Sequence, residues 1–345
     1  MKKIGILTIA SIAALSTTAI AAVSADQTLV STKAGSAIIL DGKIDKAWAG
    51  AKEITVKVDE MPYEPSNGYK GMQDTDVTIK SLYDESHVYF LFTYKDPTKS
   101  LERFPWVKQE DGSWKKLSNK DDTGHDNTYY EDKFAMFWDI STKGFDEEGC
   151  MVACHLDEPG DKSAGRKYTD SADETIDMWH AKYVRSMPMG MFDDQYVDNN
   201  TDPKKNKGWG RKGDTGKGGY KNNDNADKSG PAFMNLNPTA DELYYVIPSK
   251  RVPFVDNYKA GDVVPGISIA PMMGGRADIL SRNDYKDGVW TLEVMRALKT
   301  EGENVETQDV QFTDKSKTYP FGIAVFDNSQ INHLFHAETL ELKFK

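Results

Sequence analysis

Two cysteines and a histidine lie close together at Cys150, Cys154 and His155, in the sequence GCMVACH. These are the only cysteines of the chain. Covalent haem attachment needs two thiols that reach the two vinyl groups of one porphyrin edge, followed at once by an imidazole that lies under the iron. The usual spacing is C-x-x-C-H; here three residues separate the cysteines, and this wider loop spans the vinyl groups if the backbone bulges. The motif favours one covalently attached haem c with His155 as the proximal ligand.

Other interpretations of the same motif remain open. A disulfide between Cys150 and Cys154 would suit an oxidising compartment, although it closes a short loop and stabilises little. A zinc site needs two further ligands, and no second Cys/His pair stands nearby in the sequence. Free thiols are disfavoured outside the cytoplasm. The spacing alone therefore leaves haem, a disulfide and a metal or redox role as alternatives.

A haem in an electron-transfer protein usually takes a second axial ligand. His180 is the first choice for this distal position, because its neighbours are apolar and Trp179 beside it can pack on a porphyrin face. Met136 is the alternative, since a thioether raises the reduction potential relative to a second imidazole. Other histidines, among them His333 and His336, are interpreted as structural. The predicted cofactor-binding residues are Cys150, Cys154, His155, His180, Met136 and Trp179, with His155 and His180 on the iron.

No common catalytic motif is present in the sequence. It holds no P-loop, no G-x-S-x-G serine motif, no HExxH zinc helix and no dinucleotide fingerprint. The paired acids Asp193 and Asp194 are interpreted as turn or capping residues, with a calcium-binding or catalytic role as the alternative. Because a cofactor carries its own redox chemistry, no acid–base pair or nucleophile is required. We expect an electron-transfer protein and not an enzyme.

Period-two patterns dominate the chain and must build the scaffold that holds these residues. In DVTIKSLYDESHVYFLFTYKDP, apolar residues alternate on both sides of a turn, which predicts a hairpin. Residues 173–187 are the best helical candidate, with Ile176, Trp179 and Tyr183 on one face. Many short strands with long loops predict an all-β, antiparallel β-sandwich of the immunoglobulin-like two-sheet kind, with a few short helices. The further expected strands span 54–58, 133–140, 243–248, 288–298, 321–328 and 340–344.

Two loops are longer than ordinary connections. Residues 97–131 are charged and aromatic, and 198–231 are rich in Gly, Asn, Lys and Asp. Within the second loop, 203–228 carries eight Lys/Arg, which fits either a solvated insertion or a docking surface for an acidic redox partner. We see no internal repeat and no break between domains. The sequence predicts one haem-binding β-sandwich domain over 26–345, with a long polar insertion around 198–231.

The first 25 residues have the layout of a secretory signal peptide. Lys2 and Lys3 precede an uncharged apolar run that ends in small residues, which predicts cleavage near Ala25 and a periplasmic location. No later stretch is apolar enough to span a bilayer. The chain has 43 basic and 54 acidic residues, a net charge of −11 that falls to about −13 without the two signal lysines. So acidic a surface argues against nucleic acid and anionic lipid as partners.

Several segments in order resemble one haem-binding family. They are DGKIDKAWAGAKEITVKV, VYFLFTYKDPTKS, YYEDKFAMFWDI, GCMVACH, IDMWHAKYVRSMPMGMFDDQYV, DGVWTLEVMRAL and YPFGIAVFDN, spread over nearly the whole mature chain. In this series the sequence resembles the family typified by the gamma subunit of ethylbenzene dehydrogenase, the haem subunits of type II DMSO reductases, and especially its c-type cytochrome branch. The resemblance implies an antiparallel β-sandwich that holds a single haem and passes electrons to or from a partner.

The resemblance also bears on the iron ligands. In members that bind haem without covalent bonds, it implies an axial pair of Met and Lys. We match the methionine to Met136 and leave the lysine unassigned, with Lys182 as the position considered. The sequence departs from that pattern by placing His155 after two cysteines, which leaves the second ligand open.

Two functions of different classes follow from these observations. The leading one is a periplasmic monohaem c-type cytochrome that carries electrons by outer-sphere transfer. Its redox partner would be a molybdenum/iron–sulfur oxidoreductase, of which it would be the haem subunit, or another cytochrome. The alternative is a carbohydrate-binding β-sandwich module, in which Cys150 and Cys154 form a disulfide and exposed Trp106, Trp114 and Trp209 stack on sugar rings.

Overall fold

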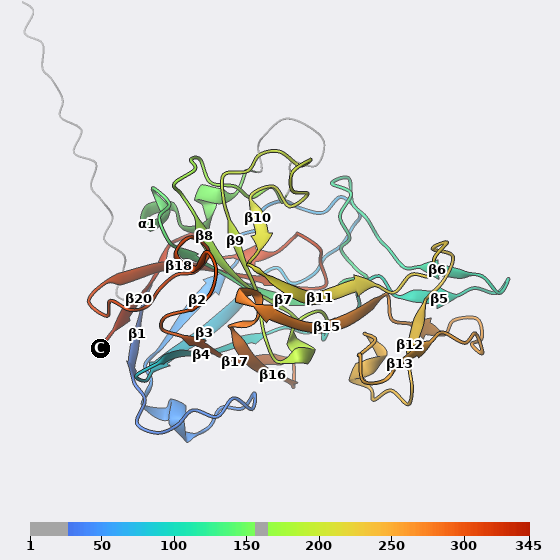
Figure 1. Ribbon diagram of the computed structural model, residues 1–345, viewed down its shortest axis with the longest axis horizontal. Helices are drawn as coiled ribbons and strands as arrows, with labels where there is room; N and C mark the ends of the chain where they lie inside the picture. The colour runs from blue at the N-terminus through green and yellow to red at the C-terminus, as the bar shows by residue number, and fades with distance from the viewer. Residues whose placement is uncertain (1–26, 156–164) are drawn as a thin grey trace, which may run out of the picture.

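The computed structural model describes residues 27–155 and 165–345, and it is built mainly of β-strands (Figure 1). The predicted signal peptide 1–25 lies outside the described residues. No helix in the described part of the chain is long and apolar enough to cross a membrane. The strands are β1 Thr28–Lys33, β2 Glu53–Val58, β3 Thr75–Tyr83, β4 His87–Lys95, β5 Trp106–Lys108, β6 Trp114–Lys116, β7 Lys133–Asp139, β8 Ile176–Lys182, β9 Asp193–Val197, β10 Arg211–Gly213, β11 Gly216–Asn222, β12 Phe233–Asn235, β13 Arg251–Pro253, β14 Val263–Val264, β15 Ile267–Gly274, β16 Leu280–Lys286, β17 Val289–Ala297, β18 Thr318–Phe326, β19 Leu334–Phe335 and β20 Leu340–Phe344. The short helices are η2 Lys46–Gly50, α1 Phe145–Glu148, η3 Gly149–Ala153, η4 Met187–Met189, η5 Asp241–Leu243, η6 Gly275–Ala277 and α2 Val305–Gln308.

Most strands belong to one curled sheet that folds over itself into a sandwich. Its strand order is β10-β9-β8-β7-β18-β20-β1-β3-β4-β17-β16, with β19 beside β18 and β2 beside β3. Strand β1 links the two halves, because residues 28–31 pair with β20 whereas residues 32 and 33 pair with β3. These two pairings of β1 are parallel, and β7, β8, β9 and β18 pair with their neighbours in antiparallel fashion. The predicted all-β sandwich is confirmed.

The main core lies between the two halves of the sandwich. On β7, Phe134, Met136 and Trp138 point into it, and Trp179 of β8 packs on Trp138 with ring centroids 5.3 Å apart. Each such side chain contributes about 1.5–3 kcal/mol when fully buried, so the period-two pattern fixes which face of each strand looks inward. The outward face of the same sheet carries a second, smaller apolar cluster. Its buried members are Ala135, Phe137, Phe145, Ala153, Ile176, Met178, Val197 and Phe326.

Two sequence-based assignments are wrong. Residues 173–187 do not form the predicted helix: residues 176–182 are strand β8, which lies between β7 and β9 in the sheet, and only Met187 belongs to a short helix, η4. All seven residues of β8 are buried, so no polar and apolar alternation reveals the strand in the sequence. Residues 243–248 form no strand either; they begin in η5, and Val246 bridges Ser268. The hairpin is confirmed as β3–β4, and the strands predicted at 54–58, 133–140, 288–298, 321–328 and 340–344 are confirmed as β2, β7, β17, β18 and β20.

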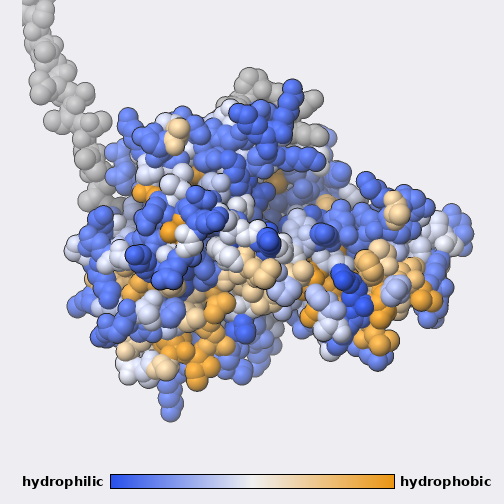
Figure 2. Space-filling view, in the orientation of Figure 1, coloured by the Kyte–Doolittle hydropathy of each residue, from blue (hydrophilic) through white to orange (hydrophobic). Residues whose placement is uncertain are grey.

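The two long loops contain strands of their own. Strands β5 and β6 lie within 97–131 and pair with each other and with β14, whereas β10 and β11 lie within 198–231. The β5–β6–β14 sheet and the β12–β13 pair build a lobe that projects from the sandwich (Figure 1). Apolar surface gathers on this lobe (Figure 2). The exposed large apolar residues of this part of the chain are Leu236, Leu243, Tyr244, Val255 and Val263.

Candidate functional site

Strand β8 presents different residues to the two faces of the sheet. Trp179 points into the core, whereas Met178, His180 and Lys182 point outward, as expected for alternate positions of a strand. The outward residues line a cavity of about 750 Å³, which lies within the usual range for ligand and cofactor sites. The cavity is therefore attached to the rigid sheet, which fixes the positions of these side chains.

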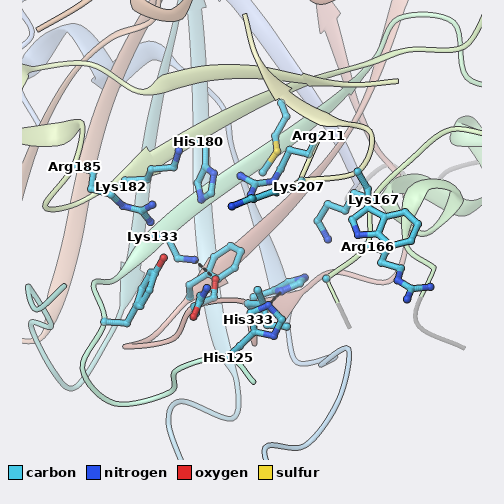
Figure 3. Close-up of a pocket in the computed structure, with 18 of the residues that line it drawn as sticks. His125, Lys133, Arg166, Lys167, His180, Lys182, Arg185, Lys207, Arg211 and His333 are labelled. Atoms are coloured by element: carbon cyan, nitrogen blue, oxygen red, sulfur yellow. Dashed lines mark hydrogen bonds between the residues drawn. The ribbon is translucent and has the colours of Figure 1, made fainter. Parts of the chain in front are cut away.

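The cavity is strongly basic. Its described lining residues include eight Lys/Arg and three His and no Asp or Glu, although the chain as a whole has a net charge of −11. Figure 3 shows that these side chains gather from several separate segments. So much positive charge around one concave site favours an anionic ligand. The basic residues are Arg103, Lys133, Arg166, Lys167, Lys182, Arg185, Lys207 and Arg211, and the histidines are His125, His180 and His333.

Two buried carboxylates hold cations of the cavity wall. Glu131 accepts hydrogen bonds from Nε of Arg185 and from the backbone N–H groups of residues 184 and 185. Asp193 accepts from Nζ of Lys182 on one oxygen, and from Nε and a terminal nitrogen of Arg276, at 2.9 and 2.6 Å, on the other. Burial lowers the pKa of Lys182 to about 8, and Asp193 opposes this effect. Glu131 and Asp193 therefore fix the positions of Arg185 and Lys182 in the cavity wall.

His180 is held as a neutral imidazole with one free nitrogen. Its Nδ1 lies 3.2 Å from Oε1 of Gln195, which also accepts from Arg211, while the amide nitrogen of Gln195 donates to Asp193. The amide oxygen of Gln195 can only accept, so Nδ1 of His180 carries the proton. Burial, and next the charge of Lys182, lower the pKa of His180 well below its usual value. Nε2 is buried and has no hydrogen-bond partner among the described residues, so its lone pair is available.

His333 is a second imidazole in the cavity. Its Nδ1 donates to the backbone carbonyl of Ile331 at 2.6 Å, and burial lowers its pKa to about 3. The ring of His333 stacks on Phe326 with centroids 4.7 Å apart. Phe326 also contacts His180, with ring centroids 5.9 Å apart. Sequence reasoning interpreted His333 as structural, and the segment before the last strand gave no pattern that would place it in a site.

Cys150 lies in the short helix η3 and Cys154 directly follows it, next to the cavity. Cys150 packs against the outer apolar cluster that includes Met178 and Phe326, both of which also line the cavity. The ammonium of Lys167, another lining residue, lies 3.7 Å from Sγ of Cys154. Both cysteines are free thiols, and burial, and next the nearby Cys154, raise the pKa of Cys150 to about 12. The disulfide alternative does not match this arrangement.

His155 lies at the edge of the described chain, beside the cavity. Its ring stacks on Tyr168 with centroids 3.6 Å apart, and its Nε2 donates to the backbone carbonyl of Tyr168 at 3.0 Å. Tyr168 in turn lies 6.2 Å from Trp209, which lines the cavity together with Arg166. In this conformation Nε2 of His155 is engaged, so iron ligation through this atom requires the ring to leave the carbonyl.

The structure does not bring Met136 and Trp179 to the cavity. Met136 is 1% exposed and Trp179 is fully buried, and both belong to the core between the sheets, on the opposite face of β7 and β8. Nε1 of Trp179 donates to Asp177 at 3.0 Å in that interior. Successive residues of a strand face opposite sides of the sheet, so Trp179, the sequence neighbour of His180, lies on the other side. The prediction of a helix over 173–187 hid this alternation.

The tryptophans of the carbohydrate-binding alternative do not form an exposed platform. Trp106 is 4% exposed, and its Nε1 donates to the carbonyl of Asn223. Trp114 packs edge-on against Phe254, with ring centroids 5.3 Å apart. Trp209 lies in the cavity wall, where the guanidinium of Arg166 stands 4.2 Å from its ring. Trp106 is thus buried, and Trp114 and Trp209 are half-buried against other side chains.

Sequence reasoning found His180 and the cysteine motif but missed the basic wall. The signal was partly visible, because the eight Lys/Arg of 203–228 include Lys207 and Arg211, which line the cavity together with Tyr220. The charge of Arg185 lowers the pKa of Tyr220 to about 7. Lys207, Arg211 and Tyr220 of this loop therefore belong to the site, whereas most of its other lysines are exposed to solvent, as expected for a solvated insertion; these are Lys204, Lys205, Lys217, Lys221 and Lys228.

Comparisons with known proteins give one family and three structures. The model of the ethylbenzene dehydrogenase family matches residues 45–337. Among curated proteins, none matches the chain. A family 9 carbohydrate-binding module from Caldicellulosiruptor kristjanssonii is similar in its glucose complex (10% identity, 92% of this chain and 95% of that chain, TM-score 0.33) and in its cellotriose complex (10%, 92% and 93%, 0.34). A putative carbohydrate-binding protein from Bacteroides uniformis has 9% identity over 92% of this chain and 99% of that chain, with a TM-score of 0.32. Scores this low carry no argument about ligands.

Proposed function

The chain belongs to the ethylbenzene dehydrogenase family, and from this premise we propose that it carries electrons through one covalently attached haem c. Cys150 and Cys154 form the thioether links, and the basic cavity beside them receives the porphyrin. The bound haem supplies one-electron redox chemistry, which outer-sphere transfer passes to or from a partner. On this proposal the chain is an electron-transfer protein and not itself an enzyme.

The observation that carries the proposal is the orphaned Nε2 of His180. A buried nitrogen without a partner is costly, because it has lost its hydrogen bond to water and gained nothing. Here the ring is neutral, and Gln195 fixes its tautomer from behind, which is how proteins commonly orient a metal-binding histidine. We assign His180 as the distal iron ligand and Gln195 as the residue that orients it.

The charge of the cavity supports the same ligand. A haem carries two propionates, which are carboxylates, and Arg and Lys bind carboxylates through charge-assisted hydrogen bonds. Arg185 and Arg211 are already oriented by Glu131 and Gln195, so they need little reorganisation to receive an anion. The apolar part of the lining, Met178 and Phe326, would contact the ring. The donor set and the volume therefore fit the group.

His155 completes the proposed site as the proximal ligand. Its ring is now bonded to the carbonyl of Tyr168, so attachment of the haem would have to exchange that hydrogen bond for the iron. The rings of Tyr168 and Trp209 stack between His155 and the cavity. The movement of the His155 ring away from Tyr168 would open this stack. His333 is the competing histidine, because it too is neutral and lies in the cavity.

A partner and a location complete the proposal. Its family supports a role as subunit of an oxidoreductase complex, with a molybdenum/iron–sulfur oxidoreductase or another cytochrome as the redox partner. The apolar surface on the projecting lobe supports a protein contact, since exposed apolar patches mark interaction sites (Figure 2). The signal-like leader and the covalent haem both suit the periplasm, where haem c is attached after export.

The test is expression of the whole chain with haem-maturation machinery. We expect the intact mass to include one haem, the haem to remain bound in a denaturing gel, and the pyridine haemochrome to show a c-type spectrum. Cys150→Ala and Cys154→Ala each reduce covalent haem, and the double variant abolishes it. A mass equal to that of the bare polypeptide under these conditions would refute the proposal.

A second measurement separates the two candidate distal ligands. His180→Ala should convert the oxidised haem from low spin to high spin, whereas His333→Ala should leave it low spin. His87→Ala, at the first residue of β4, is the matched control, because that ring is hydrogen-bonded to Ser86 and lines no part of the cavity. The opposite pattern would transfer the distal role to His333.

A further inference from the structure

A group of buried carboxylates lies on the side of β8 opposite to the cavity. Asp177 of β8, Asp194 of β9 and Asp309, which follows α2, each offer an oxygen within 4.8 Å of the others. Asp177 and Asp194 are fully buried, and Asp309 is 2% exposed. Asp214 and Asp278 act on the same group electrostatically, so five acids from five segments converge there.

The group lacks the partners that buried carboxylates normally have. One oxygen each of Asp177, Asp194, Asp309 and Asp214, and both oxygens of Asp278, are buried without a hydrogen-bond partner among the described residues. Asp214, which is 4% exposed, makes a side-chain hydrogen bond with Asp309, another acid of the group. Buried charges that are neither paired nor hydrogen-bonded cost several kcal/mol each, so this arrangement calls for a positive ligand.

Arg296 fills this role only in part. Its guanidinium is fully buried and forms ion pairs with Asp177 and Asp309, but both distances are 3.6 Å, beyond hydrogen-bond distance. Its one short hydrogen bond runs from a terminal nitrogen to the carbonyl of Val310 at 2.6 Å, and its Nε and other terminal nitrogen make no hydrogen bond among the described residues. One guanidinium supplies a single positive charge for five carboxyl groups.

We propose that Asp177, Asp194, Asp214, Asp278 and Asp309 bind one Ca²⁺ ion. The donors are all carboxylate oxygens with no sulfur or imidazole, which selects a hard cation. Ca²⁺ accepts six to eight oxygens at about 2.3–2.6 Å, and oxygens of Asp177, Asp194 and Asp309 lie within 4.8 Å of one another, close enough to share one such ion. Mg²⁺ keeps several waters and prefers about 2.0–2.1 Å, which suits a dry cage of carboxylates poorly.

The backbone already presents the ligands for such an ion. The other oxygen of Asp177 accepts from the N–H of Val310 at 2.9 Å, and that of Asp309 accepts from the hydroxyl of Thr300 at 2.5 Å. Asp194 is oriented by the N–H of Gln195 at 3.0 Å. These bonds leave the unpartnered oxygens facing one another. The ion would join β8 and β9 to the segments that carry Asp214, Asp278 and Asp309. The inference does not rest on the proposed function.

The other acidic group of the fold shows what a satisfied cluster looks like. Asp132 accepts from two backbone N–H groups, and Asp327 accepts from the N–H of Met72 and the hydroxyl of Thr98. Asp96 keeps one unpartnered oxygen there. This group supplies the matched control, because it has the same residue types and burial but donors already in place.

The experiment uses the whole mature protein after treatment with EGTA and passage over a chelating resin. Elemental analysis after dialysis against micromolar Ca²⁺ should give one ion per chain, and the melting temperature should rise with Ca²⁺ concentration. An equal concentration of Mg²⁺ should give a smaller rise. Asp194→Asn and the rim variant Asp278→Asn should weaken Ca²⁺ binding about tenfold or more, whereas Asp327→Asn should leave it unchanged.

Two outcomes would overturn the inference. If the untreated and the Ca²⁺-dialysed wild type hold no stoichiometric calcium and the melting temperature ignores Ca²⁺, the acids share protons instead of binding a metal. If Asp327→Asn abolishes the response while Asp278→Asn does not, the ion belongs to the other cluster. Both readouts work on protein prepared without haem, so a failure of the haem proposal leaves this test intact.

Discussion

Removing the charge of Glu131 should destabilise the protein strongly, because it leaves Arg185 buried without its counter-charge. Glu131 is fully buried and accepts three hydrogen bonds, one from the guanidinium of Arg185 and two from backbone N–H groups. Breaking one partner of a buried ion pair costs about 3–5 kcal/mol, since the remaining charge stays desolvated. Glu131→Gln keeps the shape and part of the hydrogen bonding, so we expect a loss of about 3–4 kcal/mol in the free energy of unfolding.

Urea unfolding followed by tryptophan fluorescence measures this loss directly. Glu85→Gln is the matched control, because its partner Lys33 lies on the surface, where screening by water leaves the midpoint unchanged. The double variant Glu131→Gln/Arg185→Met removes the stranded charge and should recover part of the stability. A Glu131→Gln midpoint equal to that of the wild type would refute the idea that Glu131 neutralises Arg185 in the cavity wall.

Three further predictions concern single residues. Burial raises the pKa of Asp96 to about 7, so the folded protein holds a proton there that the unfolded chain releases near pH 4. The free energy of unfolding should therefore fall by about 2–3 kcal/mol as the pH rises from 5 to 8, and Asp96→Asn should remove most of this slope in urea titrations at the two pH values. Gly218→Ala should lower the free energy of unfolding by more than about 1 kcal/mol, because φ of Gly218 is +88° and a Cβ would overlap the carbonyl of Pro271. Gly112→Ala, with open space around it, should lower the free energy of unfolding less, and thermal unfolding measures both. Tyr220, whose pKa the charge of Arg185 lowers to about 7, should ionise between pH 6 and 8 by absorbance at about 295 nm, and Tyr220→Phe should remove that step.

The fold could largely be predicted from the sequence because most strands keep one face in the core and alternate. The predicted hairpin is β3–β4, whose apolar positions alternate on each side of its turn. Strand β8 was not predicted, because the cavity wall and the outer apolar cluster cover its second face. Its sequence therefore has no polar positions that mark an exposed side. The apolar run at 243–248 resembled a strand, but Leu243 and Tyr244 are exposed on the lobe.

The candidate site could be predicted only where chemistry is local in sequence. Cys150, Cys154 and His155 are adjacent, and an apolar setting singled out His180. Lys133, Arg185 and His333 come from distant segments and become neighbours only through the pairing of β7, β8 and β18. The net charge of the chain does not reveal this basic cavity, because acidic residues elsewhere outnumber the basic ones.

The two sites meet on β8 and β9, and the sheet keeps their charges apart. Neighbouring residues face opposite sides, so Asp193 pairs with Lys182 and Arg276 in the cavity wall whereas Asp194 joins the acidic group in the core. Burial first, and then the charges of Asp177, Asp214 and Asp278, raise the pKa of Asp194, whereas Arg296 lowers it. No charge of the basic cavity is among these main causes. Under the two proposals above, an anionic porphyrin on one face and a Ca²⁺ ion on the other would each bring the opposite charge to the same pair of strands.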